Sequence, residues 1–135
     1  MIQNNEDLEG LLRRLNKGFA LAGEGVYLVG MGEGRPPAAL SIQPPVLVLQ
    51  IDVGRLPRGS AEAMVPLLER LLELNASGLV HAAFALESGS IVLTAALEIV
   101  SLDSNELEAA LADMDIALAE HVPALRELSK RLGLE

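Results

Sequence analysis

The chain has 135 residues, of which 50% are hydrophobic, and its only aromatic residues are two Phe and one Tyr. That length predicts one domain over residues 1–135, with a core of Leu, Ala, Val and Ile. The absence of cysteine excludes disulfides and thiolate chemistry, and a net charge of −9 disfavours nucleic-acid binding because phosphates are repelled.

The negative charge is concentrated in one part of the chain. Residues 71–125 contain nine acidic residues and neither Lys nor Arg. Complementary charge raises association rates and selects partners, so this segment would attract a basic region of a client protein. The alternative is that the charge only keeps a leucine-rich chain in solution.

No apolar run approaches the roughly 20 residues of a membrane-spanning helix, so we expect no membrane insertion.

Residues 5–17 are predicted to form the first helix. Acidic residues open it and basic residues close it, which is the charge order that a helix dipole favours. An apolar stripe at helical spacing follows its length: Leu8, Leu11, Leu12 and Leu15. Two short apolar runs, residues 19–23 and 26–30, then flank Glu24-Gly25 and predict a hairpin.

A glycine-rich loop follows, with the sequence VGMGEGRPP over residues 29–37. Its spaced glycines admit an anion-binding or nucleotide-binding site that uses the Gly30–Arg35 loop, with Arg35 holding the anion. Such a cradle requires a helix that starts at the loop, and Pro36-Pro37 follows here instead. The favoured interpretation is therefore a flexible turn.

A central strand and a second helix are predicted next. Residues 46–54 form a β-branched and leucine-rich run behind Pro44-Pro45, which is typical of a buried strand. Ser60 is suited to cap a helix over residues 61–75, and Pro66 is expected to kink that helix or to mark its true start. Its apolar surface is broader than one stripe and predicts contact with a second copy of the chain: Met64, Leu67, Leu68 and Leu71 are the candidate residues.

Two further strands are expected over residues 79–86 and 91–99, joined by a turn at Glu87–Ser90. Both faces of this strand pair are apolar or small, unlike a sheet with one face in water. One face carries the candidate partner-binding residues His81, Ala83, Ala85, Thr94 and Ala96. Two interpretations stand: a long helix covers this face, or a partner does.

The last predicted helix begins after Asp103 or Ser104, continues to about residue 131 and ends at Gly133. Pro123 is expected to bend it or to split it in two. Asp113 and Asp115 are interpreted as a solvated acidic surface. Neither histidine of the chain has a nucleophile or a metal-ligand cluster at a recognisable spacing, so we expect no enzyme, no metal and no cofactor.

The predicted order is helix, three strands, helix, two strands, helix, which is an α+β fold with an antiparallel sheet in the order α-β-β-β-α-β-β-α. A pattern within this order resembles the type III secretion chaperone-like fold. It consists of LLELNA (residues 71–76) followed by AFALESGSIVLTAALEIVSLDSNELEAAL (residues 83–111). That group includes the CesT/Tir chaperone family and the YbjN-like proteins. The resemblance covers residues 60–131 by pattern and residues 5–54 by topology.

The resemblance implies a small acidic cytoplasmic protein that is homodimeric and holds a segment of a secreted client on apolar patches. By position, the helix over residues 61–75 is the one that would form the dimer. The resulting hypothesis is a non-enzymatic protein-binding domain with an unidentified protein client. The alternatives are a regulatory or stress-related protein of the YbjN kind and, from another class, the anion-binding loop described above.

Overall fold

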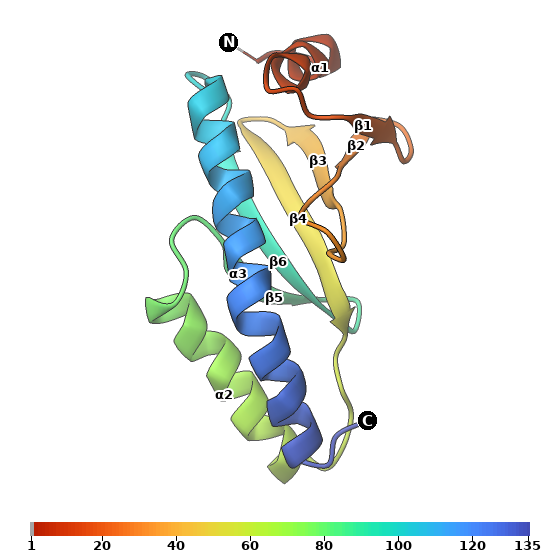
Figure 1. The fold of residues 1–135 in the computed structure, drawn as a ribbon, viewed down its shortest axis with the longest axis vertical. Coiled ribbons are helices and arrows are strands. Elements are labelled where there is room, and N and C mark those ends of the chain that lie inside the picture. Colours follow the sequence, from red (N-terminus) through yellow and green to blue (C-terminus); the bar gives the residue numbers. More distant parts are fainter. Residues whose placement is uncertain (1) are drawn as a thin grey trace.

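The computed structural model describes residues 2–135, which form three helices and six strands (Figure 1). In chain order the elements are α1 (Asn5–Arg14), β1 (Phe19–Leu21), β2 (Val26–Val29), β3 (Ala38–Gln43), β4 (Val46–Arg55), α2 (Ala61–Ser77), β5 (Ala83–Glu87), β6 (Ser90–Glu98) and α3 (Ser104–Arg131). The α+β class is confirmed, with one more strand than predicted.

The strands form one antiparallel sheet in the order β1-β2-β3-β4-β6-β5. The two long strands, β4 and β6, pair with each other, and β1 and β5 are the edges of the sheet. A two-residue turn joins β5 to β6, and Ser88 and Gly89 both have positive φ, at 50° and 82°. Positive φ at both central residues is typical of a type I′ hairpin turn, so the predicted turn is confirmed.

The strand that the sequence did not reveal is β3. Its six residues, AALSIQ, have little β-branched character and directly follow the glycine and proline loop. They form a strand because both neighbours pair with them: Leu40 lies opposite Tyr27 of β2 and Leu49 of β4. Pro44-Pro45, predicted to introduce β4, is the turn between β3 and β4, where a residue without an N–H disrupts no ladder.

The fifth strand is shorter than predicted. It begins at Ala83, and residues 79–82 form a loop that places His81 outside the sheet. In this loop the His81 backbone N–H donates to Asp113 Oδ2 of α3 at 2.9 Å. A side chain of α3 thus satisfies a backbone donor that would otherwise pair within a sheet.

All three helices pack on the same face of the sheet, and α3 crosses it with α2 alongside (Figure 1). The buried core joins the inward side chains of the helices to alternate residues of the strands. On α3 the buried residues lie at helical spacing along one side: Leu107, Ala110, Leu111, Met114, Ala117, Leu118, Val122 and Leu125. None of the described helices is long and apolar enough to cross a membrane.

Neither proline divides the helix that contains it. α3 is continuous through Pro123, and α2 is continuous through Pro66 from its cap at Ser60. Both prolines are exposed, where water can hydrogen-bond the carbonyl left without a helical donor. Asp103, one of the two predicted caps, caps α3 by accepting from Glu106 N, and Gly133 with φ 72° ends it as predicted.

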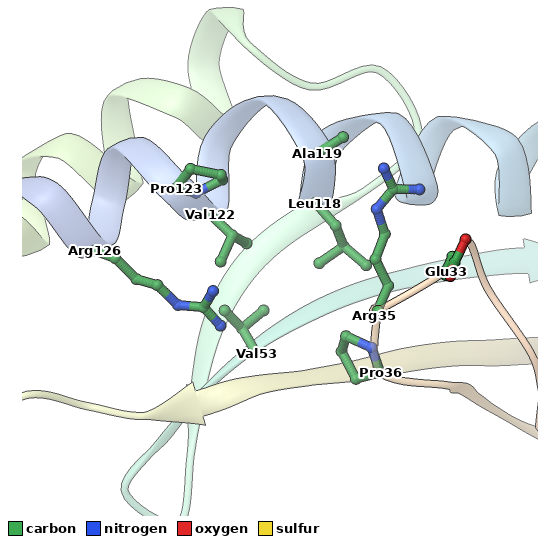
Figure 2. Close-up of a pocket in the computed structure, with 10 residues that line it drawn as sticks. Glu33, Arg35, Pro36, Val53, Leu118, Ala119, Val122, Pro123 and Arg126 are labelled. Carbon is green, nitrogen blue, oxygen red and sulfur yellow. The ribbon is translucent and has the colours of Figure 1, made fainter.

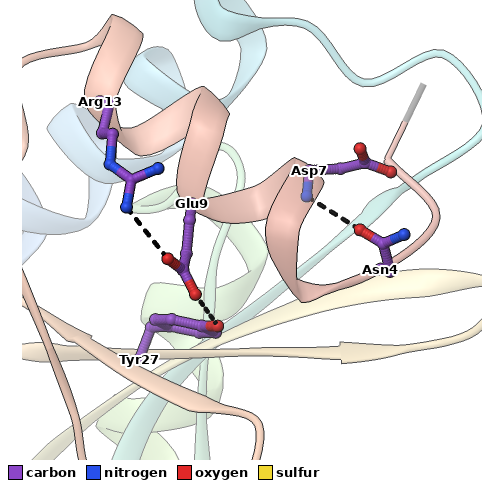
Figure 3. A network of polar contacts seen from close by, with 5 residues as sticks. All are labelled: Asn4, Asp7, Glu9, Arg13 and Tyr27. Atoms are coloured by element: carbon purple, nitrogen blue, oxygen red, sulfur yellow. Dashed lines mark hydrogen bonds and ion pairs between the residues drawn. The ribbon is translucent and has the colours of Figure 1, made fainter.

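A polar network attaches α1 to β2 (Figure 3). Asn4 caps α1 by accepting from the Asp7 N–H. Further along, the Glu9 carboxylate accepts two hydrogen bonds, one of 2.7 Å from the Tyr27 hydroxyl and one of 3.2 Å from Arg13 Nη2. The hydrogen bond to Glu9, followed by burial, raises the pKa of Tyr27 above its ordinary value. The ring of Tyr27 meets Phe19 edge-on with centroids 5.4 Å apart, so α1, β1 and β2 form one unit.

Candidate protein-binding surface

No helix covers the second face of the sheet. None of its residues belongs to the core cluster or packs against it, whereas the residues facing the helices do. We call this surface the open face, and its apolar and small residues are Val26, Leu28, Ala39, Val46, Val48, Ala83, Ala85, Val92, Thr94 and Ala96. The interpretation that a long helix covers it is therefore wrong.

The strand register places four of the five residues predicted for this surface together. Ala83 lies directly opposite Thr94, while Ala96 lies opposite Val48 and Ala85 opposite Val92. His81, the fifth, lies in the loop before β5 and is not part of the sheet. The sequence missed the contribution of β3 because that strand was not predicted, and it did not place the predicted strand β2 next to this surface.

The open face combines small and aliphatic residues with polar ones, and its polar residues also include Ser41, Gln43, Gln50, Asp52, Glu87, Ser90 and Glu98. Ala85 and Ala96 are exposed, Val46 and Val48 between them and β3 are half-buried, and Val92 is buried. Its polar groups include a hydrogen bond of 2.9 Å from Gln50 Nε2 to Glu87 Oε2. No helix of the described chain covers this face, and Ala85 and Ala96 are its exposed apolar residues.

A second apolar surface lies where α2 meets the edge strand β5. Two of the four predicted α2 residues, Leu67 and Leu71, are buried in the core of this chain. Met64 and Leu68 are half-buried at the margin. The residues that do face outward are Val65, Leu72 and Leu86, with Leu72 68% and Leu86 51% exposed. We call this the α2–β5 surface.

A shallow hollow of about 300 Å³ lies on the α2–β5 surface, lined by Leu68, Leu71, Leu72, Phe84, Ala85 and Leu86. Leu72 and Leu86 were not among the candidate residues. Helical spacing alone could not separate the outward side of α2 from its inward side, because leucines occupy both.

Asn75 protects the edge of β5. Its side-chain amide donates to Phe84 O at 3.0 Å and accepts from Phe84 N at 2.7 Å, as a neighbouring strand would. The Phe84 backbone groups point away from β6, so without Asn75 they would form an open sheet edge. The edge of β5 is therefore closed to a further strand at this position.

The glycine-rich loop already holds a carboxylate of this chain. Arg35 donates to Asp115 Oδ2 at 2.7 Å, and the Gly32 N–H donates to Asp115 Oδ1 at 3.0 Å. A Cβ at Gly32 would collide with the Arg35 guanidinium. The loop leads into β3 and no helix starts there, so an external anion would have to displace Asp115.

Asp113 and Asp115, interpreted from the sequence as solvated, are instead two anchors on different sides of α3. One binds the loop before β5 and the other binds the loop before β3. The histidines form no catalytic arrangement: His121 Nε2 donates to Gly78 O at 3.1 Å and His81 is exposed. Within residues 2–135, no cluster of three or more His, Cys, Asp or Glu could hold a metal.

A sequence profile of the CesT_Tir_1 family matches residues 1–131. The chain belongs to the CesT_Tir_1 family. This confirms the resemblance drawn from residues 60–131 and extends it across nearly the whole chain. No curated protein matches the sequence.

Solved structures share the fold of this CesT_Tir_1 member. The heterodimeric ExoU-SpcU complex from the type III secretion system of Pseudomonas aeruginosa matches with a TM-score of 0.67 and 16% identity, over 86% of this chain and 95% of that one. YbjN from E. coli matches with a TM-score of 0.67 and 13% identity, over 99% and 96%. The HopA1-SchA chaperone-effector complex matches with a TM-score of 0.57 and 18% identity, over 89% and 90%.

Proposed function

We propose that this protein is a non-enzymatic, chaperone-type binding protein of the cytoplasm. Its open face holds an extended segment of a secreted client protein. The observation that carries the proposal is a sheet face with small and β-branched residues that no helix of the described chain covers. An extended chain places alternate side chains on one side, which suits a sheet surface that carries small and β-branched residues.

Family membership and the neighbouring structures support a protein ligand. Two of those neighbours are complexes, one from a type III secretion system and one described as a chaperone with its effector. The excess of acidic residues supports a client segment with basic residues next to its apolar ones, since the charges would steer it onto the surface.

The test uses one charged substitution at the centre of the open face. Ala96 is exposed, so Ala96→Arg leaves the core intact and adds a large cation where the client would lie. Ala124→Arg places the same side chain on the exposed side of α3 and is the matched control. Clients are captured from the source cells by each purified variant, identified by mass spectrometry, and then titrated by calorimetry as purified segments.

We expect the wild-type protein and Ala124→Arg to bind the same client segment, and Ala96→Arg to lose at least about tenfold in affinity, because a buried unpaired charge costs several kcal/mol. If Ala96→Arg binds the segment as tightly as the control does, the open face is not the client site and the proposal fails.

A regulatory protein of the YbjN kind is the second candidate. It is favoured by the extent of the YbjN match, which covers 99% of this chain. Deletion of the gene separates the two: a chaperone predicts the loss of one secreted protein, whereas the regulatory candidate predicts an unchanged set of secreted proteins.

A further inference from the structure

Two adjoining hollows lie between α3 and the end of β4. The first, of about 280 Å³, is bordered by Arg35 and Pro36 of the loop before β3 (Figure 2). The second, of about 200 Å³, is bordered by Arg55 where β4 ends. Val53, Val122 and Arg126 line both hollows, which therefore form one continuous surface that we call the α3–β4 groove.

The charge of this groove is opposite to that of the molecule. Three arginines line it, at positions 35, 55 and 126, and Glu33 is its one acidic residue. The whole chain has 19 acidic and 10 basic residues. Arg35 is neutralised by Asp115, so the positive charge of the groove comes from Arg55 and Arg126, against Glu33, on a protein that is acidic as a whole.

Two of the three guanidinium groups are unoccupied. Within residues 2–135, the side chains of Arg55 and Arg126 form no hydrogen bond or ion pair, and both residues are exposed. Arg35 shows what these groups bind in this environment, since it holds the Asp115 carboxylate at 2.7 Å. A planar guanidinium matches a carboxylate through paired donors, more specifically than a lysine does.

The remainder of the groove is apolar. Val53 is half-buried at its floor, and Arg126 extends from α3 so that its guanidinium lies beside Val53 (Figure 2). Pro36 and Pro123 border the first hollow. Because Pro123 has no N–H, the carbonyl of exposed Ala119 lacks its helical donor and is an acceptor for an incoming backbone amide.

We infer that the α3–β4 groove binds a segment of the client protein in which an Asp or Glu lies next to an aliphatic residue. Arg126 and Arg55 bind the carboxylate, and the aliphatic side chain packs against Val53. The backbone of the segment donates to the Ala119 carbonyl. This inference rests on the proposed function, because it gives the chemistry of a second stretch of the same client.

The experiment uses two synthetic peptides with blocked ends, one that alternates Leu and Asp and one that alternates Leu and Asn. Binding is measured by fluorescence anisotropy at physiological ionic strength, where the Debye length of about 8 Å screens the distant acidic residues. The proteins are wild type, Arg126→Ala and, as the control on the same helix, Arg131→Ala. Arg126 has no partner within the described chain, so its removal leaves the fold intact.

We expect the Asp peptide to bind more tightly than the Asn peptide, and Arg126→Ala to weaken it by at least about fivefold, as for a charge-assisted hydrogen bond. Arg131→Ala should change its affinity by less than about twofold, because Arg131 lies outside the groove. Equal binding of the two peptides, or equal effects of the two substitutions, would overturn the inference.

The Ala96→Arg variant keeps this test separate from the proposed function. If Ala96→Arg loses the client while Arg126→Ala keeps its preference for the Asp peptide, only the groove inference fails. If Arg126→Ala loses that preference while Ala96→Arg still binds the client, the groove binds an acidic segment and the open face is not the client site.

Discussion

At the scale of single residues, a few polar side chains hold this apolar fold together. Glu9, Asp113 and Asp115 each bind a group at least 18 residues away in the sequence, and Asn75 binds the backbone of Phe84 in the strand that follows its helix. Their partners lie in β2, in β5 and in the loops before β3 and β5. Hydrogen bonds to charged or amide side chains place these short segments where a leucine-rich core leaves several arrangements open.

Tyr27 is the only tyrosine of the chain, so the tyrosinate absorbance reports the titration of this one residue. Its pKa is raised, chiefly by the hydrogen bond to Glu9, so the folded state holds the hydroxyl proton more tightly than the unfolded state does. The stabilisation is complete below about pH 10 and is lost as the pH rises through the folded-state pKa. We expect the tyrosinate absorbance to appear above pH 10 while circular dichroism still reports a folded chain.

Two variants check this assignment. Glu9→Gln keeps an acceptor and removes the charge, so the pKa of Tyr27 should fall toward its ordinary value. Tyr27→Phe should lower the free energy of unfolding by about 1 kcal/mol at pH 7, and by progressively less above pH 10. A Tyr27 pKa at or below about 10 in the folded wild type would contradict the role assigned to Glu9.

At the scale of elements, Asn75 joins the end of α2 to β5. Asn75→Ala removes both hydrogen bonds to the Phe84 backbone, and we expect the free energy of unfolding to fall by about 2 kcal/mol because two partly buried backbone groups lose their partner. The measurement is urea unfolding followed by far-ultraviolet circular dichroism, which suits a chain without tryptophan.

Ser77→Ala is the control for Asn75. Ser77 lies on the same helix turn and is exposed, and its hydroxyl bonds only to the carbonyl of Glu73. We expect a change of less than about 0.5 kcal/mol. Equal effects of the two substitutions would show that the edge contact does not stabilise β5.

At the scale of the whole molecule, the α2–β5 surface is the candidate dimer interface. We expect light scattering after size-exclusion chromatography to give the mass of a dimer at two concentrations tenfold apart. A two-fold interface presents each substituted residue twice, so Leu72→Glu should yield a monomer. Leu72 is 68% exposed, so the fold itself should survive the change.

The matched control for the dimer is Ile116→Glu, since Ile116 is an exposed aliphatic residue of α3, 56% exposed, away from the α2–β5 surface. It should remain a dimer. A wild-type monomer at both concentrations would end the homodimer proposal and leave the α2–β5 surface free for a different protein.

The sequence by itself determined the helices, the long strands β4 and β6, the hairpin turn at Ser88-Gly89 and the family. These features depend on local signals, namely helical leucine spacing, β-branched runs, helix caps and turn residues. Each of these signals lies within a few consecutive residues. The resemblance to secretion chaperones also used such a contiguous pattern, LLELNA followed by the paired strands.

Only the tertiary structure decided which apolar residues face outward. Leu67 and Leu72 are chemically alike, yet the first is fully buried and the second largely exposed. Burial depends on which face of the sheet the helices occupy, and β3 became a strand only through its neighbours. The same holds for Arg126 and Arg55, 71 positions apart in sequence and brought to one groove because α3 crosses the end of β4. Such placement is a property of long-range packing and carries no local signature.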